Sequence, residues 1–318
     1  MNTCSSLKYL VVGTGGVGGA LGGFLALAGC EVTCIARGGH LQAIREKGLR
    51  LKSTLKGMPS IALKACTAEA YHDRADVIFV CVKGYSIDSV AELVRKAAHR
   101  DTLVIPLLNV YGTGERIQQR VEGVNVLDGC IYIVSYLSAP GEITQMGKIF
   151  RVVYGARKGQ YLAQETLEAV RDDLTRAGIR AVVSDDIDRE TFIKWTYISS
   201  MACTGAYFDV PVGAIQQPGR ERDLFIGLTR ENAEIGRQRG IAVPEDLLES
   251  HLRILDHLEP ESTASLQKDL AKGHASEIDG LLFQMIRMAE ETGVDIPFYR
   301  QVAAKFRPQS CYTARGIV

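Results

Sequence analysis

The sequence lacks long apolar runs and an excess of either charge. No stretch reaches the roughly 18 apolar residues that a membrane-spanning helix needs, so we expect no membrane partner. Lysine plus arginine number 37, as do aspartate plus glutamate, which leaves no basic field for nucleic acid. The first apolar strand begins at Leu7, and we expect no signal peptide before it. A small molecule is therefore the expected partner.

CxxC pairs and metal-ligand spacings are missing as well. The eight cysteines form no CxxC pair, and the six histidines form no HExxH pattern. Cysteines scattered in this way are typical of reduced, cytoplasmic proteins. We therefore expect a cytoplasmic location, reduced thiols and no metal.

Apolar strands alternating with helices dominate the first half of the chain. The expected strands are the continuous apolar runs at residues 7–12, 31–36, 75–82 and 101–108. Such runs, separated by helices, indicate a parallel sheet that is covered on both faces. Residues 124–153 favour short strands broken by glycine and proline, an antiparallel extension. A helix around residues 167–174 and a strand at 179–184 follow.

A glycine-rich turn joins the first strand to the first helix. The segment VVGTGGVGG contains Gly13, Gly15 and Gly18 at the spacing GxGxxG. In dinucleotide-binding folds one such glycine makes the tight turn, one lets the backbone approach the diphosphate, and one lets helix and strand pack closely. The diphosphate would rest on the helix N-terminus, with Gly16 and Val17 in its first turn. Glycines that only tighten the packing are the alternative.

Helical patterns replace strands after Asp185. The expected helices cover residues 187–204, 220–239, 245–258 and 276–292. Gly240 and Gly293 stand where helices stop. Ser276 with Asp279 resembles a capping box that opens the last helix. We therefore predict an α/β protein in which a Rossmann-type dinucleotide-binding domain (1–185) is followed by an all-helical domain (186–318).

The residue that ends the second strand indicates which dinucleotide is bound. An NAD enzyme would place an acid there to hold the ribose 2′-hydroxyl, but no acid lies between Glu31 and Glu46. The strand ends instead at Arg37, whose guanidinium suits a 2′-phosphate. NADPH is thus favoured over NADH, and a solvated surface arginine is the alternative.

Two further polar residues follow strands on the side of the glycine turn. Lys83 comes after the strand at 75–82, and Asn109 after the strand at 101–108. Ligands of open α/β sheets lie outside the carboxyl ends of the strands. The two side chains are therefore expected to line one crevice beside a nicotinamide, unless each is an ordinary loop residue.

One lysine interrupts an otherwise apolar helix. In ETFIKWTYISSMACTG, Lys194 is surrounded at helical spacing by large apolar side chains such as Phe192 and Trp195. A buried ammonium is costly unless it is paired. The segment alone leaves two readings open, a functional lysine or one that extends its charge into water.

These features together resemble the ketopantoate reductase family over nearly the whole chain. The matching segments are, in order, VVGTGGVGG, CIARGGHLQAIREKGLRL, CVKGYSID, LLNVYG, TFIKW and STASLQKDLAKGHASEID. The resemblance implies an N-terminal dinucleotide-binding domain, an all-helical C-terminal domain and a site in the cleft between them. It implies NADPH-dependent reduction of 2-dehydropantoate (ketopantoate) to pantoate, a step towards coenzyme A, and it leaves a homodimer open.

The resemblance also assigns roles to individual residues. Lys194 is similar to the general acid, and Glu277 to the carboxylate near the substrate hydroxyl. A positioned ammonium would stabilise the charge that develops on the carbonyl oxygen and deliver a proton to it. Burial would lower the pKa of that ammonium, while Glu277 and the cofactor phosphates would raise it.

The remaining roles concern binding. Ser265 is similar to the residue that contacts the substrate carboxylate, and Asn109 to the asparagine that borders substrate and nicotinamide. Arg37 matches the contact to the 2′-phosphate, and Lys83 matches a lysine near the cofactor. Ser265 has an alternative role as a helix cap, and Glu277 as a carboxylate favoured by a helix N-terminus.

Four positions depart from the family pattern. Ile198 and Ala202 stand where asparagines are common, Ser262 replaces another asparagine, and Val110 replaces a glycine. Another branched 2-oxo acid is therefore an alternative substrate for a site that includes Ile198 and Ser262. A non-catalytic NADPH sensor would need neither a proton donor nor its carboxylate partner. A methyltransferase would need an acid in place of Arg37.

Overall fold

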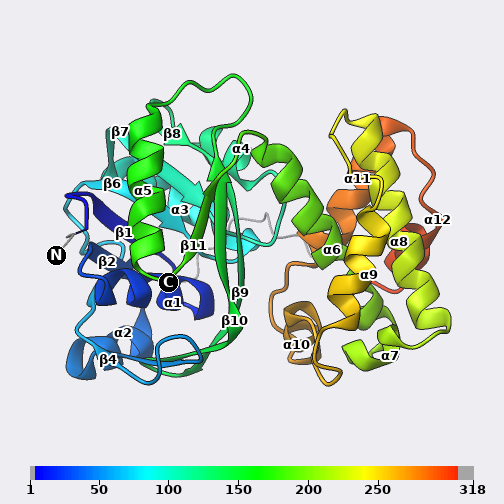
Figure 1. The fold of residues 1–318 in the computed structure, drawn as a ribbon, viewed down its shortest axis with the longest axis horizontal. Helices are drawn as coiled ribbons and strands as arrows, with labels where there is room; N and C mark the ends of the chain where they lie inside the picture. Colours follow the sequence, from blue (N-terminus) through cyan, green and yellow to red (C-terminus); the bar gives the residue numbers. More distant parts are fainter. Residues whose placement is uncertain (1–3, 307–318) are drawn as a thin grey trace. The chain divides into compact units, whose positions relative to one another are not determined.

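We describe residues 4–306 of a computed structural model, which divides into two compact units. The first unit extends to Leu108 and resumes at Gly112–Ile187, and the second comprises Asn109–Tyr111 and the chain from Asp188 onward. The first unit holds the strands and the second is helical (Figure 1). The predicted α/β class with a helical C-terminal part is confirmed.

The first unit is built on a six-stranded parallel sheet. Its order is β5 (Lys64–Cys66), β2 (Glu31–Ile35), β1 (Lys8–Val12), β6 (Ala75–Val80), β7 (Ala98–Pro106) and β8 (Asn125–Val126). Tyr9 and Val11 of β1 belong to one apolar core, whereas Leu10 and Val12 belong to another on the opposite face. Both faces are therefore covered, as expected for a parallel sheet.

Helices and a second sheet cover the two faces of the parallel sheet. The helices are α1 (Gly16–Leu27), α2 (Gly38–Lys47), η1 (Gly84–Ser86), α3 (Ile87–Ala97), α4 (Thr113–Gln118) and α5 (Gln164–Arg176). The second sheet joins β11 (Arg180–Val183), β10 (Glu142–Gly155), β3 (Leu49–Ser53) and β4 (Ser60–Ile61), with β9 (Asp128–Ala139) paired to β10. Leu21 and Phe24 of α1 lie in one core with residues of both sheets. Gly19 and Gly22 allow this close packing, because a Cβ on them would lie 2.7 Å from Ile143 and 2.4 Å from Sγ of Cys34.

The antiparallel extension consists of two long strands rather than short ones. β9 and β10 have 12 and 14 residues and form a hairpin that turns at Gly141. Gly147, which suggested a break in the sequence, instead lies at an irregularity where the register shifts between Met146 and Phe150. An isolated glycine inside a strand pattern can mark a bulge instead of an end.

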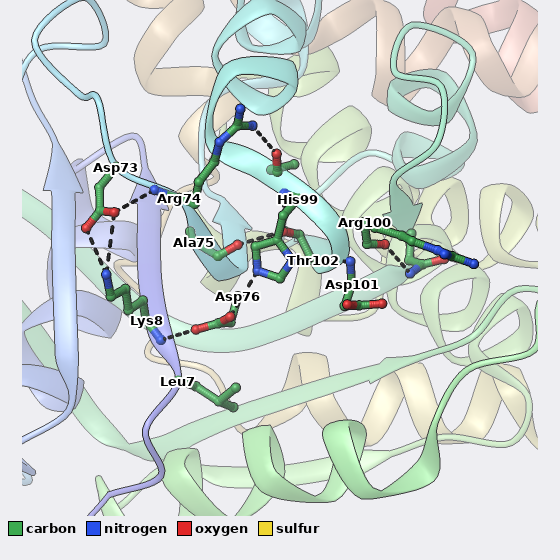
Figure 2. Close-up of polar contacts among 12 residues, drawn as sticks. Leu7, Lys8, Asp73, Arg74, Ala75, Asp76, His99, Arg100, Asp101 and Thr102 are labelled. Carbon is green, nitrogen blue, oxygen red and sulfur yellow. Dashed lines mark hydrogen bonds and ion pairs between the residues drawn. The ribbon is translucent and has the colours of Figure 1, made fainter.

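Polar contacts tie together the amino ends of the central strands. Asp76 of β6 accepts a hydrogen bond from the Lys8 backbone N–H (2.7 Å) and pairs with Nε2 of His99 on β7 (3.0 Å; Figure 2). Nδ1 of His99 accepts from the N–H of Asp101 (3.2 Å). These residues lie at the amino ends of the strands, and the glycine turn follows the carboxyl end of β1. Because ligands of such sheets bind at the carboxyl ends, we assign these contacts a structural role.

Two cysteines depart from the expected chemistry. Cys4 and Cys30 form a disulfide with a Cα–Cα distance of 5.3 Å, so the prediction of reduced thiols is wrong for this pair. Their segment is also anchored through buried Asp173, which accepts hydrogen bonds from the Ser5 N–H (2.9 Å) and the Tyr9 hydroxyl (2.7 Å). The disulfide joins the chain before β1 to the turn before β2.

The second unit packs its helices around Phe192, Leu228 and Met285. Its elements are α6 (Ile187–Phe208, which begins in the first unit), α7 (Val212–Gln216), α8 (Arg220–Gln238), α9 (Leu247–Asp256), α10 (Ser265–Ala271), the π-helical turn η2 (Asp279–Phe283), α11 (Gln284–Thr292) and α12 (Pro297–Ala303). Gly240 and Gly293 have positive φ at helix ends, as predicted. Within residues 4–306 no helix is long and apolar enough to cross a membrane.

The last long helix begins later than the capping-box prediction. The Leu281 N–H donates to the Glu277 carbonyl (3.0 Å), and Glu277 stands directly before the first helical residue, Ile278. The Asp279 carboxylate pairs with Arg287 (3.0 Å). The predicted helix start at Ser276 is therefore slightly early, and the capping box with Asp279 stays a prediction.

Candidate active site

The three fingerprint glycines have three different surroundings. Gly13 has a φ of +96°, which a tight turn requires and other residues rarely adopt. A Cβ on Gly18 would strike the Gly13 carbonyl, so this glycine allows helix and strand to pack closely. Gly15 is exposed, and a Cβ there would meet nothing within 4 Å. The turn therefore presents an open backbone surface at Gly15, beside the first N–H groups of α1.

Gly16 and Val17 follow in the first turn of α1. A Cβ on Gly16 would lie 2.5 Å from the carbonyl oxygen of Ser135, because β9 runs close to this turn. Val17 is partly buried and packs against the core of the first unit. Both residues can offer backbone N–H groups at the helix N-terminus, where an anion is favoured.

Arg37 lies where the sequence predicted, directly after β2. It is exposed, and its carbonyl accepts the first bond of α2 from the Leu41 N–H (3.3 Å). The guanidinium thus stands at the start of a helix whose first two residues, Gly38 and Gly39, carry no side chains. This arrangement leaves room for a phosphate group beside Arg37.

His40 is a residue of this region that sequence reasoning missed. Its Nε2 lies 2.8 Å from the carbonyl oxygen of Thr14, and its Nδ1 accepts from the Gly141 N–H (2.9 Å). Since the Gly141 N–H can only donate, the ring carries its hydrogen on Nε2 and donates to Thr14. Burial lowers the pKa of His40 below its usual value, while the Thr14 carbonyl opposes this shift. The neutral ring links α2 to the glycine turn and to the β9–β10 turn.

Lys83 lies at the carboxyl end of β6, close to the glycine turn. A Cβ on Gly13 would be 2.9 Å from Cγ1 of Val82, the residue before Lys83. The Lys83 carbonyl accepts from the Ser86 N–H (2.8 Å), which fixes the turn into η1. Lys83 and the glycine turn therefore both lie at the carboxyl ends of the parallel strands.

Lys194 and Asn109 lie together in the second unit. Lys194 is only 7% exposed, and its ammonium donates to Oδ1 of Asn109 across 2.8 Å. A buried ammonium needs such a partner, because its desolvation would otherwise be costly. Lys194 is thus an internal, oriented cation and does not extend into water.

Aromatic side chains hold the segment that carries Asn109. The ring of Tyr111 stacks on Trp195 at a centroid distance of 5.4 Å and meets the edge of Phe192 at 5.4 Å. Its carbonyl accepts from Nε2 of Gln284 (3.0 Å). Tyr111 gave no sequence signal, and yet it fixes this segment to α6 and α11.

Glu277 is also buried, with 7% exposed, at the start of the helix that continues into η2. Ser262 is partly buried, and its carbonyl accepts from the Val212 N–H (2.9 Å). Ser265 is exposed at the first position of α10. Gln267, which sequence reasoning missed, positions this serine: its side chain accepts from the Ala264 N–H (2.9 Å) and donates to the Val210 carbonyl (2.9 Å).

The two departures on α6 have different surroundings. Ile198 is partly buried and packs against two apolar clusters of the helical unit. Ala202 is 1% exposed and lies inside the helical core. Ile198 therefore stays a candidate for lining a substrate pocket, whereas an amide at position 202 would have to enter the core.

Comparison with known proteins identifies the family. Residues 9–159 match the family model described as Ketopantoate reductase PanE/ApbA, and residues 186–309 match that of the C-terminal domain, Ketopantoate reductase PanE/ApbA C terminal. The chain belongs to the ketopantoate reductase family. It is thus an oxidoreductase of a dinucleotide-binding family.

Individual relatives and solved structures match most of the chain. The uncharacterized oxidoreductase YkpB of Bacillus subtilis is 27% identical over 301 residues, 95% of this chain and 98% of that protein. The solved 2-dehydropantoate 2-reductase of Porphyromonas gingivalis W83 has a TM-score of 0.79 at 30% identity, covering 95% and 99% of the chains. A D-mandelate dehydrogenase solved with NADH and anilino(oxo)acetate shares the fold, with a TM-score of 0.83, 22% identity and coverage of 94% and 96%.

Proposed function

We propose that this chain is an NADPH-dependent reductase that converts 2-dehydropantoate to pantoate. The observation that carries the proposal is the buried ammonium of Lys194 held by the carboxamide of Asn109. A protein that only senses a dinucleotide gains nothing from an internal cation with an oriented partner, since burying it costs free energy. A reductase of a carbonyl group does gain, because the cation stabilises developing negative charge.

The first unit fits a dinucleotide phosphate. The open backbone at Gly15 and the N–H groups of Gly16 and Val17 would hold the diphosphate on α1. Arg37 would hold a 2′-phosphate at the start of α2, with Lys83 near the other end of the cofactor. The D-mandelate dehydrogenase neighbour was solved with NADH, so the preference for NADPH rests on Arg37 and on the absence of an acid after β2.

Bound NADPH would supply the hydride that reaches C2 of the 2-oxo acid. As the C=O bond opens, its oxygen gains negative charge, and Lys194 donates a proton from Nζ to that oxygen. Asn109 accepts one N–H of the ammonium, which directs the remaining hydrogens. Lys194 regains its proton from solvent after the alcohol leaves, so one hydride and one proton are consumed in each turnover.

Substrate recognition is assigned to the helical unit. Glu277 would accept a hydrogen bond from the substrate hydroxyl, and Ser265 would donate one to the carboxylate, with Ser262 and Ile198 as further lining. Another branched 2-oxo acid is the second candidate substrate. It is favoured by Ile198, whose apolar side chain offers no partner for a 4-hydroxyl group.

The proposal is tested by NADPH oxidation against a panel of 2-oxo acids. We expect 2-dehydropantoate to give the highest kcat/KM and NADH to be a poorer reductant. Lys194→Ala is the matched control for enzyme-independent oxidation. If no 2-oxo acid is reduced, the catalytic proposal is wrong, and if a different acid gives a higher kcat/KM, the substrate assignment is wrong.

A further inference from the structure

The side chain of Val110 packs directly against the Cα of Gly280. Val110 directly follows Asn109 and is buried. A Cβ built on Gly280 would lie 2.7 Å from both Cγ1 and Cγ2 of Val110, closer than real Cβ atoms approach other atoms. The valine side chain thus fills the place that a side chain at position 280 would take.

Gly280 belongs to the π-helical turn η2, three residues after Glu277. Such a turn breaks the regular pattern of helical hydrogen bonds and frees carbonyl groups. Two carbonyls of η2 are used by α6: that of Gly280 accepts from Trp195 Nε1 (2.9 Å), and that of Leu281 accepts from the Ser199 hydroxyl (2.5 Å). The π turn is therefore fixed to the helix that carries Lys194.

These contacts close a ring of three segments. Lys194 on α6 bonds to Asn109, the neighbouring Val110 packs on Gly280, and Gly280 bonds back to Trp195, the residue after Lys194. Each segment is thus held by the other two. The branched Cβ of valine restricts rotation about χ1, so Val110 keeps the segments at a fixed separation.

We propose that Val110 and Gly280 are a complementary pair of positioning residues that holds the carboxamide of Asn109 on the ammonium of Lys194. A side chain at position 280 would push Val110 outward, and Asn109 would move with it. The bond between Lys194 and Asn109 is 2.8 Å long, and a displacement of Asn109 would take it out of the usual range of about 2.7–3.2 Å. The inference rests on the proposed role of Lys194 as proton donor.

The test is a cycle of Val110→Ala, Gly280→Ala and the double variant, assayed with NADPH and 2-dehydropantoate. We expect Gly280→Ala to lower kcat by about 10-fold to 100-fold, because small displacements of catalytic groups are costly. Val110→Ala removes the two methyl groups that cause the clash, and we expect its kcat to be less than about 10-fold below that of the parent. The kcat of the double variant should lie within about threefold of the kcat of Val110→Ala.

Gly227→Ala is the matched control. A Cβ on Gly227 would lie 2.6 Å from the ring of Phe298, so it also creates a clash inside the helical unit, but on α8. It should lower stability while leaving kcat of the folded enzyme unchanged, and Val110→Ala should not rescue it. Trp195 is the sole tryptophan of the chain, so its emission should shift in Gly280→Ala and return in the double variant.

The outcomes of these measurements decide for or against the pair. A parental kcat in folded Gly280→Ala, or a loss that the double variant does not restore, overturns the pair. If Gly280→Ala does not fold, the kcat of Val110→Ala is compared with that of the double variant. The proposal requires these two values to be similar, because alanine at position 280 meets no valine methyl groups in the double variant. Lys194→Ala separates the two proposals: if it retains turnover, the proposed function fails, and if it alone is inactive, only the positioning role fails.

Discussion

The ammonium of Lys194 donates a hydrogen bond to the side-chain oxygen of Asn109, although 85 residues separate the two positions. The bond stabilises a cation that is almost fully removed from water. Loss of the cation should therefore affect the chemical step much more than cofactor binding.

Lys194→Ala removes the proposed proton donor. We expect kcat to fall by about 10²–10⁴, the usual range for loss of general acid catalysis. The NADPH affinity, measured by fluorescence titration, should stay within a few-fold of the parent value, because the cofactor contacts are assigned to the first unit. Circular dichroism checks that the variant is folded. Turnover close to that of the parent would exclude this role.

Arg37→Ala removes the proposed 2′-phosphate contact. A charge-assisted hydrogen bond is worth about 1.5–3 kcal/mol, so NADPH should bind roughly tenfold to a hundredfold more weakly. NADH lacks the phosphate, and its affinity should change little. Dissociation constants for both cofactors provide the measurement, and equal losses for the two would indicate a structural role for Arg37.

His40→Ala removes the link between the glycine turn and the β9–β10 turn. Two hydrogen bonds of about 1 kcal/mol each are lost, and we expect NADPH to bind about fivefold to tenfold more weakly. His40→Gln can both donate and accept, so it should recover much of the affinity. The comparison is made by titration at constant pH. If the two variants bind alike, the hydrogen bonds of His40 do not position the turn.

His251 of α9 should make the protein sensitive to acid. Its ring packs against Tyr197 at 5.3 Å, and burial lowers its pKa to about 4, opposed by the Ile193 carbonyl. The unfolded chain, with a pKa near 6.5, binds the proton more readily. Stability is thus complete above about pH 6.5 and decreases by about 3 kcal/mol as the pH falls to about 4.

Urea unfolding of the parent and of His251→Phe between pH 4 and 7 measures this contribution. The phenylalanine keeps an aromatic ring in the core and removes the titrating group. The pH dependence should be weaker in the variant by about the stated free energy. Equal slopes in the two proteins would show that another group causes the acid sensitivity.

Ile198 should widen the range of substrates. We expect a branched 2-oxo acid without the 4-hydroxyl to be reduced as well, although less efficiently than 2-dehydropantoate. Ile198→Asn would restore a hydrogen-bonding partner and raise the ratio of the two kcat/KM values by about fivefold, or about 1 kcal/mol. Complete rejection of the deoxy acid by the parent would assign the hydroxyl contact to another residue.

The sequence was informative wherever a local pattern determines geometry. The turn around Gly13 needs a positive φ, and the helix of Lys194 has a periodicity that can be read directly. Neither depends on a distant residue. The start at Glu277 was predicted one residue too early, because Ser276 and Asp279 match a capping box by type.

Contacts between distant segments could not be read in this way. Cys4 and Cys30 are 26 residues apart, a spacing without diagnostic value, so their disulfide was missed. His40 was missed because its partner Gly141 lies 101 positions away. Asn109 follows a strand of the first unit, and nothing local indicates that it packs with the second.

Asn109–Tyr111 belong to the helical unit, although the chain on both sides of them belongs to the first unit. This division limits where the protein can be cut into fragments. Because these residues belong with the helices, a single cut after Ile187 would leave them on the wrong fragment. The C-terminal piece would contain Lys194 without its carboxamide and Trp195 without the ring that covers it. The halves are therefore not interchangeable modules, and a chimaera with a foreign helical half must match its residues to those three positions.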